Sequence, residues 1–258
     1  NARIWDNEFS NMQLTLPQYV KSAIWVVGGR PNILTRIEGN SFSVCDQGVQ
    51  LEGETDADIV GNYFSNIDKN GIYYTNLKGN VVNIRDNDFV NAQNGIFAYM
   101  PKHSTSVISM NRFNWTNNMG FYGIRFFGTN DLNEKLTIGL LNDFNAVKSK
   151  KAIWVMNTEK PLIDNNIFKV KNQNYIPYYS YPKAVHLQDC AGALVVNNSI
   201  TAIGNPTLSS SSYGIQFELS ENTTILCNRI EKTGFAIQAV SNCDASYEIG
   251  RASCRERV

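Results

Sequence analysis

The chain has 258 residues, and its 23 lysines and arginines are balanced by 23 aspartates and glutamates, so the formal net charge is zero. This balance argues against nucleic acid as a partner, because nucleic-acid-binding domains concentrate basic residues on one face. No apolar run approaches the roughly 18 residues that a membrane-spanning helix needs, so we expect no membrane insertion.

A short phrase recurs along almost the whole chain. It places an aliphatic residue three positions before an asparagine and an apolar residue two positions after it, as in Ile84, Asn87 and Phe89. A Gly-Ile pair or a close relative then follows, as in Gly95-Ile96. The asparagines are 22 to 33 residues apart, and they are Asn7, Asn40, Asn62, Asn87, Asn111, Asn142, Asn166, Asn198 and Asn228.

Each copy of the phrase holds three alternating runs that are too short for helices and are separated by Asn, Gly, Asp or Ser. About 22–25 residues provide room for three strands and three turns, so the copies predict stacked coils of a solenoid. Nine copies predict about nine coils and a rod roughly 43 Å long. In the sixth copy Ile138 comes one place early, which predicts a one-residue slip or bulge.

The repeated asparagine is expected to occupy a turn. Its short amide tolerates a left-handed backbone and can bond locally or to the next asparagine in the stack. The loss of one such bond, as in Asn87→Ala, predicts a cost of about 1 kcal/mol. We therefore interpret these asparagines as a structural ladder.

The repeat resembles the right-handed parallel β-helix of the pectate-lyase-like superfamily, over residues 1 to about 247. The resemblance implies an all-β, single-stranded, right-handed parallel β-helix. It also implies a secreted or cell-surface bacterial protein, although the sequence contains no signal peptide. It says little about activity, because that superfamily includes polysaccharide lyases, glycoside hydrolases, phage tailspikes, epimerases and non-catalytic surface proteins.

Both ends depart from this pattern. Residue 1 falls in mid-coil, so we expect the β-helix domain, residues 1–247, to be truncated at both ends. Residues 248–258 (EIGRASCRERV) resemble a translated sequencing adapter and are expected to be a non-native tail.

The cysteines outside this expected tail match no zinc or redox spacing. Cys227 is expected to be a small buried residue, whereas Cys190 and Cys243 should lie two coils apart, too far for a disulfide. The sequence leaves open the disulfide status of Cys45, Cys190, Cys227 and Cys243.

The strand that begins at each Gly-Ile pair is predicted to send its first and third residues inward and its second and fourth outward. The second residues form the column Trp25, Gln50, Tyr73, Phe97, Arg125, Trp154, His186, Gln216 and Gln238. The fourth residues are Val27, Glu52, Thr75, Tyr99, Phe127, Met156, Gln188, Glu218 and Val240.

An outward column so rich in rings favours a sugar-binding groove, with an alternative in which the rings only pack under inserted loops. The expected stacking platforms are Trp25, Tyr73, Phe97, Tyr99 and Trp154. The expected polar contacts are Arg125, His186, Gln216, Glu52 and Glu218. Tyrosines of the insertion 169–183 would form a wall, namely Tyr175, Tyr178, Tyr179 and Tyr181.

Catalysis is the weaker interpretation. The sequence lacks an Asp-rich cluster and the lyase and glycosidase motifs of the fold, so Arg125, His186 and Glu218 are only candidate catalytic residues, with Asp131, Glu134 and Asp189 as nearby carboxylates. His103 lies in a turn expected to be exposed, and neither histidine has a partner at metal-ligand spacing. We therefore expect no metal and no cofactor, with calcium only if the protein is a lyase.

Together these patterns predict an extracellular, non-catalytic rod that displays loops and binds polysaccharide along its aromatic face. The alternative is a polysaccharide lyase or glycoside hydrolase of the same superfamily, and a tailspike-like adhesin is a third class. The oligomeric state is left open.

Overall fold

A computed structural model describes residues 2–12, 21–28, 34–75, 81–101, 104–115, 122–146, 150–174, 181–204, 210–240, 243 and 249–250. Every regular element in these ranges is a β-strand. A search of the same residues finds no helix long and apolar enough to cross a membrane.

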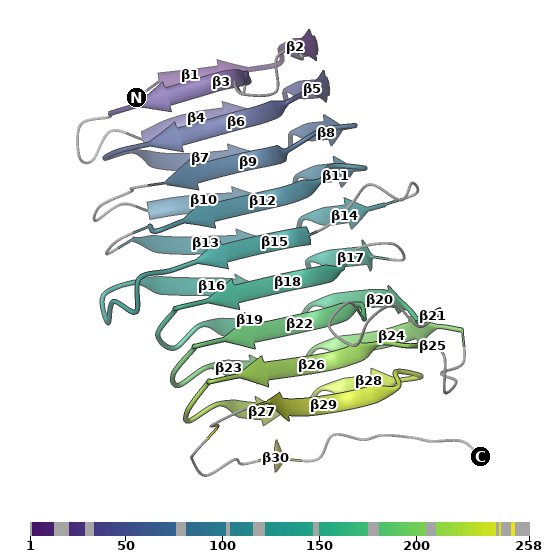
Figure 1. The fold of residues 1–258 in the computed structure, drawn as a ribbon. Helices are drawn as coiled ribbons and strands as arrows, with labels where there is room; N and C mark the ends of the chain where they lie inside the picture. The colour runs from purple at the N-terminus through teal and green to yellow at the C-terminus, as the bar shows by residue number, and fades with distance from the viewer. Residues whose placement is uncertain are drawn as a thin grey trace.

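The strands of the described chain form three parallel sheets, and each turn of the chain adds one strand to each sheet (Figure 1). Sheet A contains β1 (Ala2–Trp5), β4 (Leu34–Glu38), β7 (Asp56–Val60), β10 (Val81–Arg85), β13 (Thr105–Ser109), β16 (Lys135–Gly139), β19 (Leu162–Asp164), β23 (Leu194–Val196), β27 (Thr224–Leu226) and β30 (Ile249–Gly250).

Sheet B contains β2 (Glu8–Met12), β5 (Ser41–Cys45), β8 (Tyr63–Ser65), β11 (Asp88–Val90), β14 (Arg112–Asn114), β17 (Asp143–Ala146), β20 (Ile167–Lys171), β24 (Ser199–Ile203) and β28 (Arg229–Glu231). Sheet C contains β3 (Ser22–Val27), β6 (Gln47–Glu52), β9 (Asn70–Thr75), β12 (Asn94–Tyr99), β15 (Tyr122–Phe127), β18 (Lys151–Met156), β22 (Lys183–Gln188), β26 (Tyr213–Glu218) and β29 (Phe235–Val240). A short antiparallel pair, β21 (Gln173–Asn174) and β25 (Ser210–Ser211), joins two insertions.

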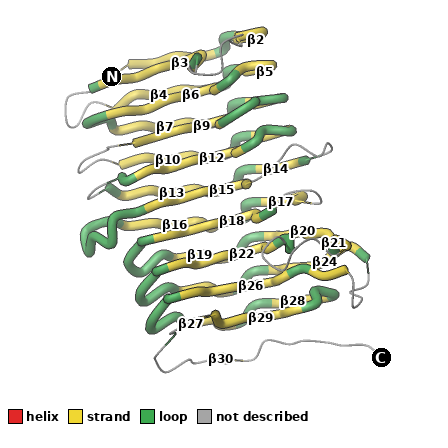
Figure 2. The backbone as a smooth tube through the Cα atoms, viewed as in Figure 1, coloured by secondary structure: helices red, strands yellow, loops and turns green. Residues whose placement is uncertain are grey.

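This arrangement confirms the predicted parallel β-helix. Sheets B and C contain nine strands each in the described chain, one for each copy of the repeated phrase. The loops drawn in green lie mainly where the chain turns from one sheet to the next (Figure 2). At the C-terminal end, β30 pairs with Ile225 and Leu226 of β27, within the stretch that we expected to be a tail.

The interior is filled by columns of like side chains. The phenylalanines of sheet B stack face to face from Phe9 to Phe168, with successive ring centroids 4.6–5.1 Å apart and planes within 7°. This spacing matches the separation of neighbouring strands. Because each ring lies on the ring of the next coil, the phenylalanine of the repeat holds the coils in register.

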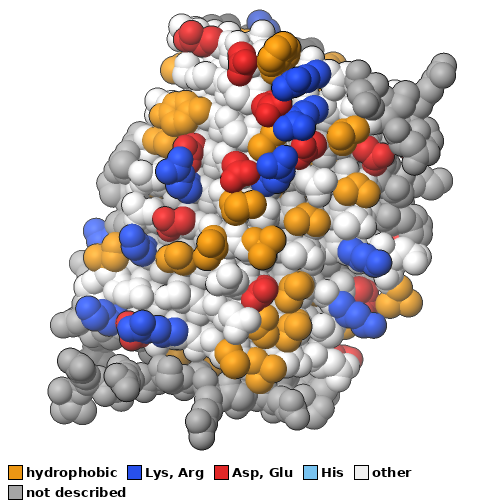
Figure 3. All heavy atoms as spheres, turned by 180° about the vertical axis from the view of Figure 1, so that it is seen from behind, with side chains coloured by type: hydrophobic (Ala, Val, Ile, Leu, Met, Phe, Trp, Pro, Cys, Tyr) orange, Lys and Arg blue, Asp and Glu red, His pale blue; other side chains and the backbone are white. Residues whose placement is uncertain are grey.

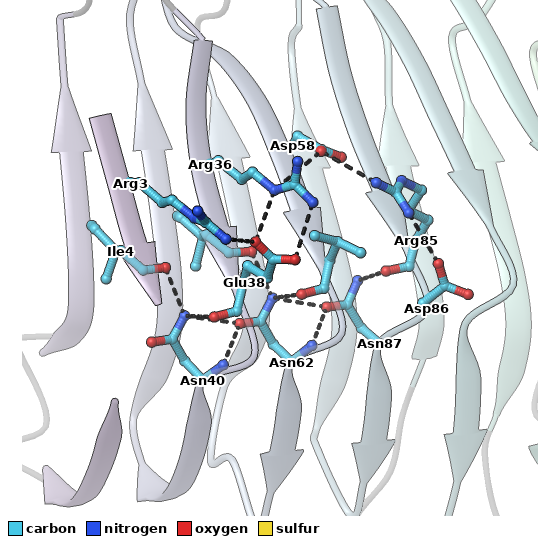
Figure 4. Close-up of polar contacts among 12 residues, drawn as sticks. Arg3, Ile4, Arg36, Glu38, Asn40, Asp58, Asn62, Arg85, Asp86 and Asn87 are labelled. Carbon is cyan, nitrogen blue, oxygen red and sulfur yellow. Dashed lines mark hydrogen bonds and ion pairs between the residues drawn. The ribbon is translucent and has the colours of Figure 1, made fainter. Parts of the chain in front are cut away.

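The asparagines form a second internal ladder at the turn between sheets A and B (Figure 4). The amide of Asn87 donates to the carbonyls of Ile59 and Arg85 and to Oδ1 of Asn111, at 2.9–3.0 Å. Its own Oδ1 accepts from the backbone and side-chain nitrogens of Asn62. The predicted bonding between successive asparagines is thus confirmed.

The predicted backbone conformation of the asparagine was wrong. The left-handed residue is the one before it, for example Asp86 (φ 57°), Met110 (φ 53°) or Asn197 (φ 55°). The asparagine follows this turn residue, and its side chain points back into the core to bond backbone groups that the turn leaves without partners.

The slip expected in the sixth copy is confirmed and lies in the turn. Ile138 pairs in register with Ile108 and Ile163, so the strand itself contains no extra residue. The additional residue gives two consecutive left-handed positions, Leu140 (φ 54°) and Leu141 (φ 68°). The turn therefore absorbs the insertion and the core columns continue.

Cys45, Cys190, Cys227 and Cys243 are free thiols. Cys190 is buried, whereas Cys227 is exposed, so the expectation of a buried Cys227 was wrong. Cys227 occupies the left-handed turn position before Asn228 (φ 54°), and side chains at this position point to solvent. Cys190 and Cys243 follow β22 and β29, two coils apart as predicted.

Candidate functional site

Sheet C lies at the front of Figure 1, and its strand pairs keep the predicted outward column in register. Each strand pair aligns the second residue of the face strand with its counterpart, from Trp25 opposite Gln50 to Gln216 opposite Gln238. Trp25 and Tyr99 are exposed, at 62% and 42%. The other predicted contact residues are less open: Tyr73, Phe97, Arg125, Trp154 and Gln216 are half-buried and His186 is buried.

A second outward column, missed in the sequence, runs beside the first. Each member is the residue directly before the Gly or Ala that begins a face strand. Neighbouring strands of sheet C pair these residues with one another and leave the Gly or Ala itself unpaired. Each of these residues stands three positions before a residue of the first column in the sequence, and this constant spacing could have revealed them. They are Ser22, Gln47, Asn70, Asn94, Tyr122, Lys151, Lys183, Tyr213 and Phe235.

In the N-terminal coils this second column is an amide ladder. Asn94 donates to Oδ1 of Asn70 (2.9 Å), and Asn70 donates to Oε1 of Gln47 (3.0 Å). Gln47 in turn donates to Oε1 of Gln50, which joins the two columns at 2.7 Å. The amides of Gln47, Asn70 and Asn94 are buried (3–9% exposed) and bond one another beneath this part of the face.

In the middle coils Arg125 is enclosed by rings. Its guanidinium carbon lies 4.7 Å from the ring centroid of Phe97, 4.4 Å from Phe127, 5.3 Å from Tyr122 and 5.0 Å from Trp154. Burial lowers the pKa of this guanidinium. The ring of Phe97 is therefore already occupied by a cation rather than free as a platform.

Trp154 is likewise engaged. The ammonium of Lys151 lies 3.5 Å from its ring centroid, and His186 stacks on it with centroids 6.0 Å apart. Phe127 meets it edge-on at 4.9 Å. Of the five predicted platforms, Trp25 and Tyr99 stay open, and Tyr73 is tilted against Phe97 at 5.5 Å. Phe97 and Trp154 lie under the cations Arg125 and Lys151.

Burial shifts the protonation of this basic group. It lowers the pKa of Lys151 to about 7, with further lowering by Lys183 and Arg125 and an opposing effect from Glu218. The pKa of Lys183 is also lowered by burial. The pKa of His186, 3.7 Å from Glu218, is shifted far below its usual value, so the imidazole is neutral at physiological pH.

The acidic candidates do not form a catalytic pair. Glu52 and Glu218 lie on β6 and β26, six strands apart in sheet C, or about 29 Å at the usual strand spacing. Glycoside hydrolysis uses two carboxylates within roughly 10 Å. Glu134 lies in the turn between β15 and β16, where it accepts hydrogen bonds from Thr129, and burial raises its pKa to about 7.

The remaining candidates separate clearly. Tyr181 is buried at 6% exposure against the ring of Tyr213, whereas Tyr175, Tyr178, Tyr179 and His103 lie outside the described residues. Asp189 is a left-handed turn residue (φ 53°) after β22. Among the described residues no group of three His, Cys, Asp or Glu side chains could hold a metal.

Figure 3 shows the molecule from behind, on the side of sheet A, where acidic and basic side chains lie close together. The N-terminal coils of this sheet carry acids and bases in contact: Arg3 and Arg36 bond Glu38, at 2.8 and 3.0 Å, and Arg85 lies 3.4 Å from Asp58 (Figure 4). These charges neutralise one another within the group. Such a surface is typical of a solvated face.

A shallow hollow of about 300 Å³ lies on sheet B and not on the predicted face. Its rim pairs Arg112 with Asp88, at 2.5 Å from Nε to Oδ1, and Arg112 is 71% exposed. Its lining comes from five strands of sheet B, β8, β11, β14, β17 and β20, whereas the column of outward rings lies on sheet C, to which we assign the candidate site.

Comparisons with known proteins agree on the fold. A family model described as "Right handed beta helix region" matches residues 1–110, and one described as "Periplasmic copper-binding protein (NosD)" matches residues 67–247. No curated protein matches the chain.

Among solved structures, a mutant of DFA-IIIase from Arthrobacter chlorophenolicus A6, in complex with DFA-III, superposes with a TM-score of 0.57 at 14% identity. The match covers 85% of this chain and 57% of that protein, so the chain spans little more than half of its length. At this identity the likeness shows the fold alone.

Proposed function

We propose that this chain, which belongs to the family of periplasmic copper-binding proteins (NosD), is a non-catalytic β-helix rod that binds polysaccharide along the outward face of sheet C. The family's description places its members in the periplasm, and we propose a location outside the cytoplasm, secreted or at the cell surface.

The copper in the family's name does not fit the described residues. No three potential ligands of the His, Cys, Asp and Glu types come together there. The buried thiol of Cys190 is directed at the backbone carbonyls of Val155 and Gln188, at 3.5 and 3.3 Å. His186, the histidine in the described ranges, stacks on Trp154 with no second imidazole or thiolate beside it. We therefore derive no role through copper.

The observation that carries the proposal is the continuous outward face of sheet C. Trp25 is exposed on the first strand, and Tyr73 and Tyr99 follow on the third and fourth. Strands of one sheet are about 4.8 Å apart, so these rings span roughly 15 Å, the length of about three sugar units. The amide ladder from Gln47 to Asn94 runs beside them. The amides of this ladder are buried, whereas Gln50 and Glu52 beside the rings are half-buried. Flat rings in line with polar side chains beside them suit an extended sugar chain.

A carbohydrate-active enzyme is the second candidate, and one observation favours it. Lys151, whose pKa is lowered to about 7, lies beside Arg125 and could take up a proton from a bound sugar at neutral pH. The wide separation of Glu52 and Glu218 argues against glycoside hydrolysis. We therefore rank binding above turnover.

The proposal is tested by electrophoresis in gels loaded with single polysaccharides, both neutral and acidic. We expect retarded migration of the wild-type protein in at least one gel, no reducing ends or unsaturated products, and loss of retardation in Trp25→Ala. Trp5→Ala is the matched control, because Trp5 is similarly exposed (54%) but lies on sheet A. Equal migration of the protein in all loaded and empty gels would refute the proposal, and product formation would favour the enzyme.

A further inference from the structure

We propose that Arg125, Lys151 and Lys183 form a subsite for an oxyanion, the carboxylate or sulfate group of an acidic glycan. This inference rests on the proposed function and names its ligand class. The three cations come from β15, β18 and β22, which are consecutive strands of sheet C.

The geometry brings two of these cations to one ring. The Lys151 ammonium lies 3.5 Å and the Arg125 guanidinium carbon 5.0 Å from the ring centroid of Trp154. Lys183 aligns with Lys151 in the β18–β22 pair and is 5% exposed. The ammonium of Lys183 lies 5.5 Å from the ring centroid of Tyr213, on the next strand. The charged ends therefore lie against rings in a region of low polarity, where attraction to an anion is stronger than in water.

Unsatisfied polar atoms gather at the same place. Of nine buried side-chain nitrogen and oxygen atoms without a hydrogen-bond partner in the described chain, five lie on this face, within β12 to β22. They are Oδ1 of Asn94, Nε of Arg125, Nε1 of Trp154 and both ring nitrogens of His186, whose side chain is only 6% exposed. Three of these atoms are donors that a bound oxyanion could accept from, namely Nε of Arg125, Nε1 of Trp154 and the protonated ring nitrogen of His186, whereas Oδ1 of Asn94 and the other His186 nitrogen are acceptors. Buried donors without acceptors cost free energy, and oxygens of a bound oxyanion would supply acceptors.

The charge balance distinguishes this subsite from the other basic region. On sheet A, Arg3, Arg36 and Arg85 are matched by Glu38, Asp58 and Asp86 in direct contact. At the subsite one carboxylate, Glu218, lies 3.7 Å from His186 and acts electrostatically on both Lys151 and Lys183. Among the residues described there, three cations face this single carboxylate. The subsite therefore keeps an excess of positive charge that a ligand anion would neutralise.

Protonation should be linked to binding. The pKa of Lys151 is lowered to about 7 by burial, Lys183, Arg125 and Lys150, and is opposed by Glu218. An anion would favour the charged ammonium, so affinity should be highest below pH 7 and fall as pH rises through it. His186 stays neutral across this range and does not contribute.

The test compares polygalacturonate, its fully methyl-esterified form and dextran sulfate by titration calorimetry, with polyglutamate as a carboxylate polymer that is not a glycan. We expect binding to an acidic glycan that weakens about tenfold in Lys151→Gln, equivalent to roughly 1.4 kcal/mol. Lys169→Gln, an exposed lysine on sheet B, should leave the affinity unchanged. Lys151→Arg should keep the affinity and abolish its fall above pH 7, because arginine stays protonated.

The outcomes separate the two proposals. Binding to polygalacturonate identifies a carboxylate, and binding to dextran sulfate alone identifies a sulfate. Equal affinity for the esterified polymer with no effect of Lys151→Gln would overturn the oxyanion subsite and leave polysaccharide binding standing. Equal affinity for polyglutamate would overturn the glycan as the source of the anion. No binding to any of these polymers would overturn the oxyanion subsite, and the absence of retardation in every polysaccharide gel would overturn polysaccharide binding as well.

Discussion

Replacing Asn87 with alanine tests how the coils are held together. The side chain is fully buried and takes part in five hydrogen bonds that its loss would break. Alanine leaves the backbone N–H of Asn62 without its acceptor and removes one donor each from the carbonyls of Ile59 and Arg85. The sequence alone suggested a single turn bond.

The expected cost follows from these orphaned groups. A buried N–H without a partner costs about 1–3 kcal/mol, and each under-bonded carbonyl adds about 1 kcal/mol. Asn87→Ala should therefore lower the free energy of unfolding by about 3–5 kcal/mol, well above the 1 kcal/mol of one lost bond.

Asn7→Ala is the matched control, because Asn7 ends the ladder and is exposed. Its amide donates to Trp5 and Asn40 only, so we expect a loss below about 1 kcal/mol. Urea unfolding followed by circular dichroism measures both variants. Equal losses for the two, or a loss near 1 kcal/mol for Asn87→Ala, would refute the view that position within the ladder sets the cost.

Three further predictions concern stability. Ile84→Asp places an unpaired charge at a fully buried site and should cost at least about 4 kcal/mol by urea unfolding, against about 1 kcal/mol for Ile84→Val; a smaller difference would contradict the inward assignment. Burial raises the pKa of Glu134 to about 7, so its contribution to stability is full below the unfolded value of 4.5 and is lost as pH rises through 7. Glu134→Gln should thus stabilise the protein by roughly 1–3 kcal/mol at pH 8 and have little effect at pH 4.5, and melting temperatures that shift equally at both pH values would be inconsistent with this cause. Arg112→Met should change the free energy of unfolding by less than about 1 kcal/mol, because its ion pair with Asp88 is exposed; a larger loss would show that the pair braces sheet B.

The fold could be predicted from the sequence because the residues that repeat are the ones that face the core. Ile84, Asn87 and Phe89 each occupy one internal column, and the same three types recur at the same places in the other coils. The left-handed position before the asparagine could not be predicted, since Gly, Asp, Met, Leu and Cys all occupy it. Its side chain points to solvent, so the core places no demand on the residue type.

The site was predictable in register but not in accessibility. Period-2 alternation placed Arg125, Trp154 and His186 in one column, and the strand pairs confirm this. Alternation says nothing about contacts within the column, where Arg125 and Lys151 occupy the ring of Trp154. The second column was missed because the ladder passes over the glycine that we took as the start of each strand.

Oxidative footprinting with hydroxyl radicals tests the central claim most directly, because the chain carries matched exposed rings on and off the proposed face. Trp25 and Tyr99 are 62% and 42% exposed on sheet C, while Trp5 and Tyr63 are 54% and 43% exposed on sheets A and B. With a bound acidic polysaccharide, we predict that oxidation of Trp25 and Tyr99 falls severalfold while that of Trp5 and Tyr63 stays constant. Protection of Trp5 and Tyr63 instead, or of all four equally, would contradict a binding face on sheet C.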